Sequence, residues 1–181
     1  VRSTPPQTAA SQIDFAGPTQ WMGLGPGELA GVEYYRAERC ATCHNVTGGT
    51  PKAGPNLVNT NKRRDSAWML AHFKNPAAVM PGTAMAPVKL SGAQLKDLTA
   101  LMMKLNMDNA EVIDTAPDFA AAGAVLYQKN FCGNCHQVNG VGAKIGPPIN
   151  GLAGRRTEVW VIDHFHNPQK VSPGTSMPPY N

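Results

Sequence analysis

Two short cysteine clusters constrain this chain more than any other feature. They occupy residues 40–44 and 132–136, and both read Cys-x-x-Cys-His. The clusters contain every cysteine of the chain, so none remains for a separate structural disulfide. At this spacing two thiols sit one turn apart and can form thioether bonds to one porphyrin, while the adjacent imidazole reaches its iron. The pattern predicts covalent haem attachment by Cys40, Cys43, His44, Cys132, Cys135 and His136.

A redox disulfide or half of a zinc site also uses two cysteines at this spacing. An internal repeat argues against both alternatives, because a shift of 92 residues that carries Cys40 onto Cys132 aligns much more than the clusters. No gap is needed. The matched pairs include Tyr35 with Tyr127, Trp68 with Trp160, His72 with His164, and Met85 with Met177. Two copies of one domain, each around one haem, explain the pattern.

Apolar residues spaced by three or four predict short helices in each copy. In the first copy we expect one helix from Pro26 into the cysteine cluster and one from Asp65 to Asn75, where a proline follows. A third helix is expected after the capping box that begins at Ser91.

The predicted fold is therefore all-α, with two small tandem domains. The expected parts are a tail over residues 1–26, a first domain over 27–106, a polar linker over 107–116 and a second domain over 117–181. The second copy reaches Asn181 without a counterpart of the third helix, so we expect further chain, or alternatively a partner, to cover that place.

A sixth iron ligand is expected from methionine, whose thioether sulfur suits electron transfer at high potential. Met85 and Met177 each lie 41 residues after the histidine of their cluster, and both follow Pro-Gly-Thr-x. Met80 is the nearest competitor, but its counterpart is Ser172, which cannot serve.

A histidine recurs at positions 72 and 164, beside tryptophan and phenylalanine. It could bind iron in place of methionine, or form a hydrogen bond near the haem edge or the methionine loop. Both interpretations remain open, and the second is favoured because each domain offers a better-placed methionine.

Haem propionates are anionic and need hydrogen-bond donors, which arginine and the indole N–H can supply. The candidate donors are Arg63, Arg64, Arg155, Arg156, Trp68 and Trp160. Solvated arginines and core tryptophans are the alternative. Pro55 and Pro147 could each offer a carbonyl to the outer nitrogen of a ligating imidazole and so fix its orientation.

The net charge is +4 with an isoelectric point near 9.0, but no run of lysine or arginine marks a nucleic-acid or polybasic membrane tract. Docking onto an acidic protein and ordinary surface charge both remain open. The sequence shows neither an apolar run of membrane-helix length nor a signal peptide at its start. Because bacteria attach haem covalently outside the cytoplasm, we expect an export signal before Val1. The expected location is the periplasm or the periplasmic face of the inner membrane.

Each half resembles a class I cytochrome c, with Cys-x-x-Cys-His, Gly-Pro, a tryptophan-bearing helix and a proline-flanked methionine, and the resemblance covers about residues 27–181. It implies small helical lobes, each wrapped around one covalent haem, so the cofactors would be two haem c groups with their iron. His44 and Met85 would bind one iron and His136 and Met177 the other.

The resemblance implies an electron carrier, not an enzyme, as a module of a respiratory or photosynthetic chain. The His-Phe-x-Asn-Pro segment is also similar to c-type parts of bc-type quinol-oxidising complexes, which makes cytochrome b or terminal oxidase subunits candidate partners. The alternatives are a diffusing periplasmic shuttle and a two-haem enzyme that acts on peroxide or thiosulfate.

Overall fold

The computed structural model describes residues 20–180, so residues 1–19 of the predicted tail and Asn181 lie outside it. Within this range there is no β-strand, only an isolated bridge between Val138 and Val141, and the predicted all-α fold is confirmed. No helix in the described range is long and apolar enough to cross a membrane. The chain divides between Phe131 and Cys132 into two compact units. We call residues 20–131 the first unit and residues 132–180 the second unit.

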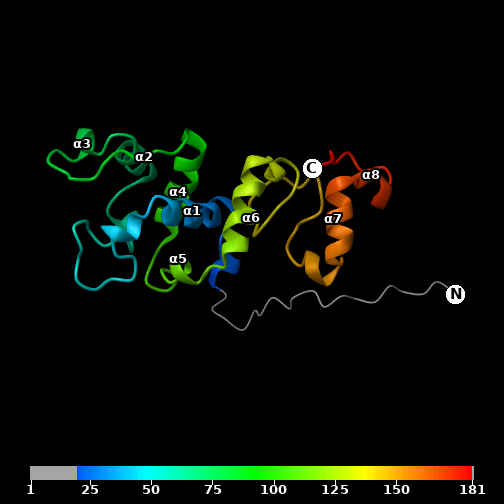
Figure 1. Ribbon diagram of the computed structural model, residues 1–181, viewed down its shortest axis with the longest axis horizontal. Helices are drawn as coiled ribbons and strands as arrows, with labels where there is room; N and C mark the ends of the chain where they lie inside the picture. Colours follow the sequence, from blue (N-terminus) through cyan, green and yellow to red (C-terminus); the bar gives the residue numbers. More distant parts are fainter. Residues whose placement is uncertain (1–19, 181) are drawn as a thin grey trace. The chain divides into compact units, whose positions relative to one another are not determined.

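The first unit is built from short α-helices joined by loops and 3-10 turns (Figure 1). The helices are α1 (Pro26–Ala37), α2 (Ser66–Lys74), α3 (Pro76–Val79), α4 (Gly92–Lys104), α5 (Val112–Thr115) and α6 (Asp118–Lys129). The 3-10 turns span Gln20–Gly23, Cys40–Thr42 and Thr60–Lys62.

Local hydrogen bonds fix where the main helices begin. The predicted capping box of α4 is confirmed: the Ser91 N–H donates to Gln94 Oε1 at 2.8 Å, and the Gln94 N–H donates to Ser91 Oγ at 3.4 Å. At α2 the Asp65 carboxylate accepts from the Trp68 N–H at 2.7 Å. These caps are short-range, so the sequence alone could predict them.

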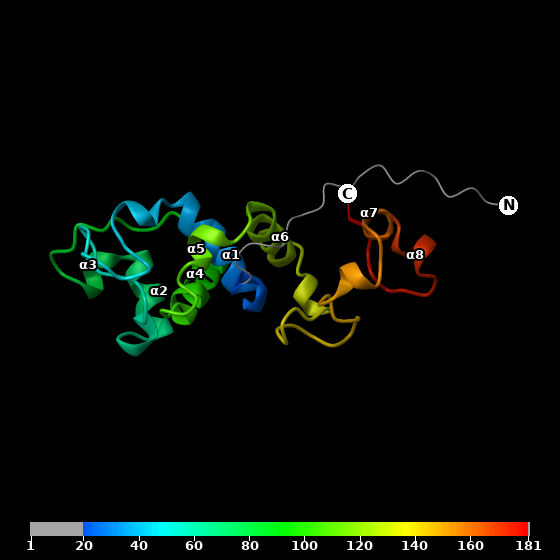
Figure 2. The same ribbon diagram turned by 90° about the horizontal axis from the view of Figure 1, so that it is seen from below.

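The core of the first unit forms where α1 and α4 pack side by side (Figures 1 and 2). A Cβ added to Gly31 of α1 would lie 2.7 Å from both the Asp97 carbonyl oxygen and Leu101 Cβ of α4. Only glycine therefore allows the helices to come this close. The fully buried large side chains around this contact are Val32, Tyr35, Leu98, Leu101, Met102 and Leu105.

Helix α6 packs against α1, although the repeat makes α6 the counterpart of α1 in the second copy. Ala124 of α6 is buried beside Ala30 and Tyr34 of α1, and Ala121 of α6 is buried in the main core of the first unit. The packing boundary at Phe131 thus differs from the boundary that the repeat suggests. The domain limits drawn from the repeat remain a prediction.

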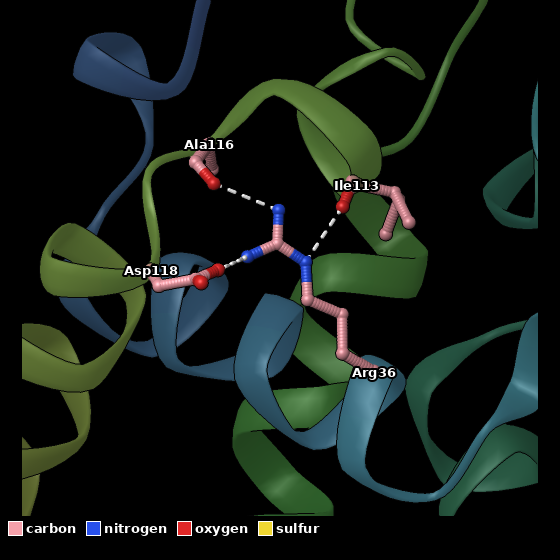
Figure 3. A network of polar contacts seen from close by, with 4 residues as sticks. All are labelled: Arg36, Ile113, Ala116 and Asp118. Carbon is pink, nitrogen blue, oxygen red and sulfur yellow. Dashed lines mark hydrogen bonds and ion pairs between the residues drawn. The ribbon is translucent and has the colours of Figure 1, made fainter.

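The segment before α6, residues 107–116, was expected to be a polar linker, but part of it packs into the first unit. Val112 and Ile113 of α5 are 0% and 2% exposed. Figure 3 shows how Arg36 of α1 holds this segment: its Nε donates to the Ile113 carbonyl at 2.8 Å and its Nη2 to the Ala116 carbonyl at 2.7 Å. Its Nη1 forms an ion pair with Asp118 Oδ1 at 3.0 Å. That carboxylate is exposed, so the ion pair adds little stability.

A buried carboxyl group lies where α1, α4 and α6 meet. Asp97 of α4 is only 9% exposed, and Gln128 Nε2 of α6 donates to its Oδ1 at 2.7 Å. Burial raises the pKa of Asp97 above its ordinary value, and the hydrogen bond from Gln128 opposes that rise in part.

The second unit contains α7 (Glu158–His166) and α8 (Pro168–Val171), with 3-10 turns at Cys132–Asn134 and Leu152–Gly154. Thr157 caps α7 by accepting from the Trp160 N–H at 3.2 Å. Helix α7 ends just before Asn167, whose side-chain oxygen accepts from the Lys170 N–H and caps the start of α8. Asn75 does the same between α2 and α3, so the Asn-Pro pair ends one helix and begins the next.

Candidate functional site

The two cysteine clusters form matching backbone turns. In the first, the Cys43 and His44 N–H groups donate to the Cys40 carbonyl at 3.1 and 3.0 Å; the corresponding distances in the second are 3.1 and 2.9 Å. Arg39 and Phe131, which precede the clusters, have the same left-handed backbone, with φ of 55° and 54°. Each turn brings its two cysteines and its histidine into one compact loop.

All four thiols are free, and their surroundings do not suit a redox pair. Burial raises the pKa of Cys40 to about 11 and also raises the pKa of Cys132, whereas redox cysteines depend on a lowered pKa. Among residues 20–180 no group of three or more His, Cys, Asp or Glu side chains is placed to hold a metal ion. The zinc alternative therefore has no ligand set in the described chain.

A backbone carbonyl orients each cluster histidine. His44 Nδ1 lies 2.8 Å from the Pro55 carbonyl oxygen, and His136 Nδ1 lies 2.8 Å from the Pro147 carbonyl oxygen. A carbonyl only accepts, so Nδ1 carries the hydrogen and Nε2 carries the lone pair with which an imidazole can bind a metal. These are the contacts that the sequence suggested for Pro55 and Pro147.

A glycine beside each imidazole makes this approach possible, and the sequence analysis assigned it no role. A Cβ on Gly54 would lie 2.3 Å from His44 Cε1, and a Cβ on Gly146 would lie 2.5 Å from His136 Cε1. Both distances are shorter than any real contact, so the imidazole fits only against glycine. The recurrence of Gly-Pro at both places was the signal that could have identified these residues.

The first arginine of each predicted pair donates hydrogen bonds to the loop that follows the Gly-Pro dipeptide. Arg63 donates to the Val58 carbonyl at 3.0 Å and to the Asn56 carbonyl at 2.9 Å. Arg155 donates to the Pro148 carbonyl at 2.6 Å. Both arginines thus stabilise the loop that carries the orienting carbonyl, and their role toward propionates stays a prediction.

The second arginine of each pair belongs to a stack of three side chains. The Arg64 guanidinium lies 4.6 Å from the centre of the Trp68 ring. Trp68 in turn stacks on His72 with ring centres 4.6 Å apart and planes inclined by 12°. The second unit repeats the stack, with distances of 4.7 and 4.6 Å and the same angle, in Arg156, Trp160 and His164.

The predicted methionine ligands sit after a tight turn in both units. Met85 and Met177 are half-buried, and the N–H of each donates to the threonine hydroxyl two residues earlier at 3.2 Å. Gly82 and Gly174 have φ of 83° and 85°, a left-handed conformation that the turn requires. Met80, the competing candidate, is 42% exposed. Among these methionines, Met85 is the one that packs against the core of the first unit.

The residues brought together fit a covalently attached haem. Each unit offers two free thiols, an imidazole oriented by a proline carbonyl and a half-buried thioether. Four buried polar atoms have no partner within the described chain: the Tyr35 hydroxyl, Asn56 Oδ1, His72 Nδ1 and His164 Nδ1. Buried polar atoms without a partner are rare in folded proteins and indicate a bound group.

Comparison with known proteins agrees with this chemistry. The cytochrome c family model matches residues 29–106 and 120–179. A cytochrome c of Gossypium barbadense is 34% identical over 82 residues, which cover 34% of this chain and 73% of that protein. A cytochrome c of Ulva intestinalis is 33% identical over 85 residues, covering 35% of this chain and 76% of that protein. No solved structure matches. The chain therefore belongs to the cytochrome c family, matched by two tandem segments, and is a c-type haem protein that transfers electrons.

Proposed function

We propose that this protein carries two haem c groups, each with its iron held between a histidine and a methionine, and that it passes electrons between redox proteins. His44 and Met85 would hold one iron, and His136 and Met177 would hold the other. The thioether anchors are Cys40, Cys43, Cys132 and Cys135. One observation carries the proposal: both histidines meet a proline carbonyl at 2.8 Å, and both methionines follow the same threonine-capped turn.

A haem iron supplies a one-electron redox couple when it is bound. The residues of this chain set its properties. The proline carbonyls hold the imidazole rings in one tautomer and orientation, and methionine sulfur favours the reduced state and hence a high potential. Two protein ligands on each iron would leave no open position for peroxide or thiosulfate. This arrangement favours an electron carrier over an enzyme.

The proposed location is the bacterial periplasm or the periplasmic face of the inner membrane, within a respiratory or photosynthetic chain. The net charge of +4 supports docking onto acidic donor and acceptor proteins, including cytochrome b or oxidase subunits. Haem-stained native electrophoresis of periplasm and solubilised membranes tests this location. A large membrane band that contains the chain supports a complex, and a small soluble band supports a diffusing shuttle.

The ligands are tested on the purified, haem-loaded protein. We expect two haems per chain, a near-infrared charge-transfer band of ferric iron bound to methionine sulfur, and no binding of carbon monoxide to the reduced protein. Met85→Ala and Met177→Ala should each remove about half of that band and open one iron to carbon monoxide. Met80→Ala is the control and should change neither signal. Ready binding of carbon monoxide to the unmodified protein would contradict the proposal.

A further inference from the structure

The loop after each cysteine cluster is hydrogen-bonded to the cluster in a different way in the two units. In the second unit the Ala143 N–H donates to the Gly133 carbonyl, inside the cluster turn, at 2.8 Å. In the first unit the matching carbonyl belongs to Ala41, and Lys52 Nζ donates to it at 2.5 Å. The same point of the turn is therefore held by a backbone amide in one copy and by a side-chain ammonium group in the other.

Two residue differences explain why the first unit cannot use its backbone for this contact. Pro51 stands where the second unit has Ala143, and proline has no N–H to donate. Thr50 stands where the second unit has Gly142. A Cβ on Gly142 would collide with the His136 carbonyl oxygen, and the φ of this glycine is 114°, so only glycine can follow this path. The backbone of the first unit therefore cannot lie against its turn in the same way.

The lysine itself occurs in both copies, so the repeat supplies an internal comparison. Lys144 is the counterpart of Lys52, and both side chains are exposed. Within residues 20–180 Lys144 donates no hydrogen bond, and the matching carbonyl already accepts from the Ala143 N–H. The lysine contacts the turn only in the unit that lacks the backbone donor. This difference indicates that the Lys52 contact compensates for the missing amide.

We propose that Lys52 is the positioning residue of the first haem site: its ammonium group holds the turn that carries Cys40 and Cys43 and so limits the access of water to the edge of the attached haem. The inference rests on the proposed attachment of haem to these cysteines. The Ala41 carbonyl lies between them in the chain, so movement of this carbonyl moves both anchors. Greater exposure to water favours the charge of ferric iron and lowers the reduction potential. The first site thus depends on one exposed side chain, and the second does not.

The test compares Lys52→Met with Lys144→Met in the haem-loaded protein. Each substitution removes one exposed charge from a matched position, but only the first removes a hydrogen bond. Hydrogen exchange followed by mass spectrometry should show the amides of residues 40–44 exchanging about fivefold faster in Lys52→Met. Those of residues 132–136 should be unchanged in Lys144→Met. Redox titration should show one midpoint potential falling further in Lys52→Met than either potential falls in Lys144→Met. Lys52→Arg keeps a donor and should resemble the unmodified protein.

A graft of the second unit's backbone tests the compensation directly. Thr50→Gly combined with Pro51→Ala gives the first unit the glycine and the N–H that the second unit uses. In this background we expect Lys52→Met to have no more effect than Lys144→Met has. An undiminished effect in the graft, or no effect of Lys52→Met without the graft, would overturn the inference.

The proposed function is tested separately by the haem content and the charge-transfer band of the unmodified protein. If two haems are bound but the Lys52 and Lys144 variants behave alike, only this inference fails. Nitrogen-15 relaxation of the lysine ammonium groups is an independent check that needs no variant. The Lys52 group must be more ordered than the Lys144 group. Equal mobility would rule out the contact even if a variant failed to mature.

Discussion

A phenylalanine that recurs in both copies of the repeat has very different surroundings in the two units. Phe73 at the end of α2 is 5% exposed, whereas Phe165, its counterpart at the end of α7, is 44% exposed. In the first unit α4 packs against α2 and buries this side chain in the core. Within residues 132–180 no helix corresponds to α4.

The candidate sites do not share this difference. The cluster turns, the histidine–carbonyl distances, the glycine contacts and the arginine–tryptophan–histidine stacks agree between the units within a few tenths of an ångström. The comparison shows that each site is built by contacts within one loop and one helix. The helix core depends instead on distant segments, and it differs between the units.

Substitution of the glycine beside each imidazole should have the largest effect of all, a loss of histidine ligation. The loss should be equal in both units. Gly54→Ala and Gly146→Ala each place a Cβ within 2.3 to 2.5 Å of a histidine carbon. The imidazole must move, so we expect loss of histidine ligation in the altered unit and a fall of about half in the low-spin haem signal. Absorbance and haem content of purified protein measure this. Gly92→Ala, where the added carbon meets nothing within 4 Å, is the control and should keep both haems.

Replacement of the phenylalanine by alanine should reduce the free energy of unfolding by different amounts in the two units. Phe73→Ala removes a buried ring and should lower the free energy of unfolding by about 3–5 kcal/mol. Phe165→Ala removes a ring that is already 44% exposed, so about 1 kcal/mol is expected. Urea unfolding followed by circular dichroism measures both. Equal losses would show that α7 is covered in solution as well as α2 is.

Alanine substitutions of the matching glycines in α1 and α6 should change the stability of the protein in opposite directions. Gly31→Ala forces a carbon to 2.7 Å from α4 and should destabilise by about 1–3 kcal/mol. Gly123 is its counterpart in the repeat, but a Cβ there meets nothing within 4 Å. Because alanine is the better helix former, Gly123→Ala should stabilise by about 0.5–1 kcal/mol. Thermal unfolding of the two variants measures both changes. A loss of stability in Gly123→Ala would mean that this face of α6 is in fact covered.

The sequence was sufficient for features that depend on neighbouring residues. It predicted the helix that starts after Ser91, the helix stop at Asn75 and the tandem resemblance to cytochrome c, and these are confirmed. The iron ligands and the arginine and tryptophan donors to the propionates stay predictions.

Features that depend on contacts distant in the sequence were missed. The polar residues of 107–116 suggested a linker, but the apolar side of α5 is buried where Arg36 reaches it from far along the chain. The packing of α6 on α1 and the contact of Gly54 with His44 are also tertiary. No local pattern encodes which helix face meets which partner.

The smallest expected effect concerns Asp97, at the α1–α4–α6 junction of the first unit. Burial raises its pKa above the ordinary 3.8, so the folded state binds this proton more tightly than the unfolded chain does. The stability that the protonated group contributes is present below the ordinary pKa and is lost as the pH rises through the raised pKa. Asp97→Asn stays neutral, and its side-chain oxygen can still accept from Gln128. Urea unfolding between about pH 4 and 7 should therefore show stability falling relative to the variant as the pH rises. Parallel pH profiles would show that Asp97 is hydrated and that the junction is looser than the buried core around Leu101.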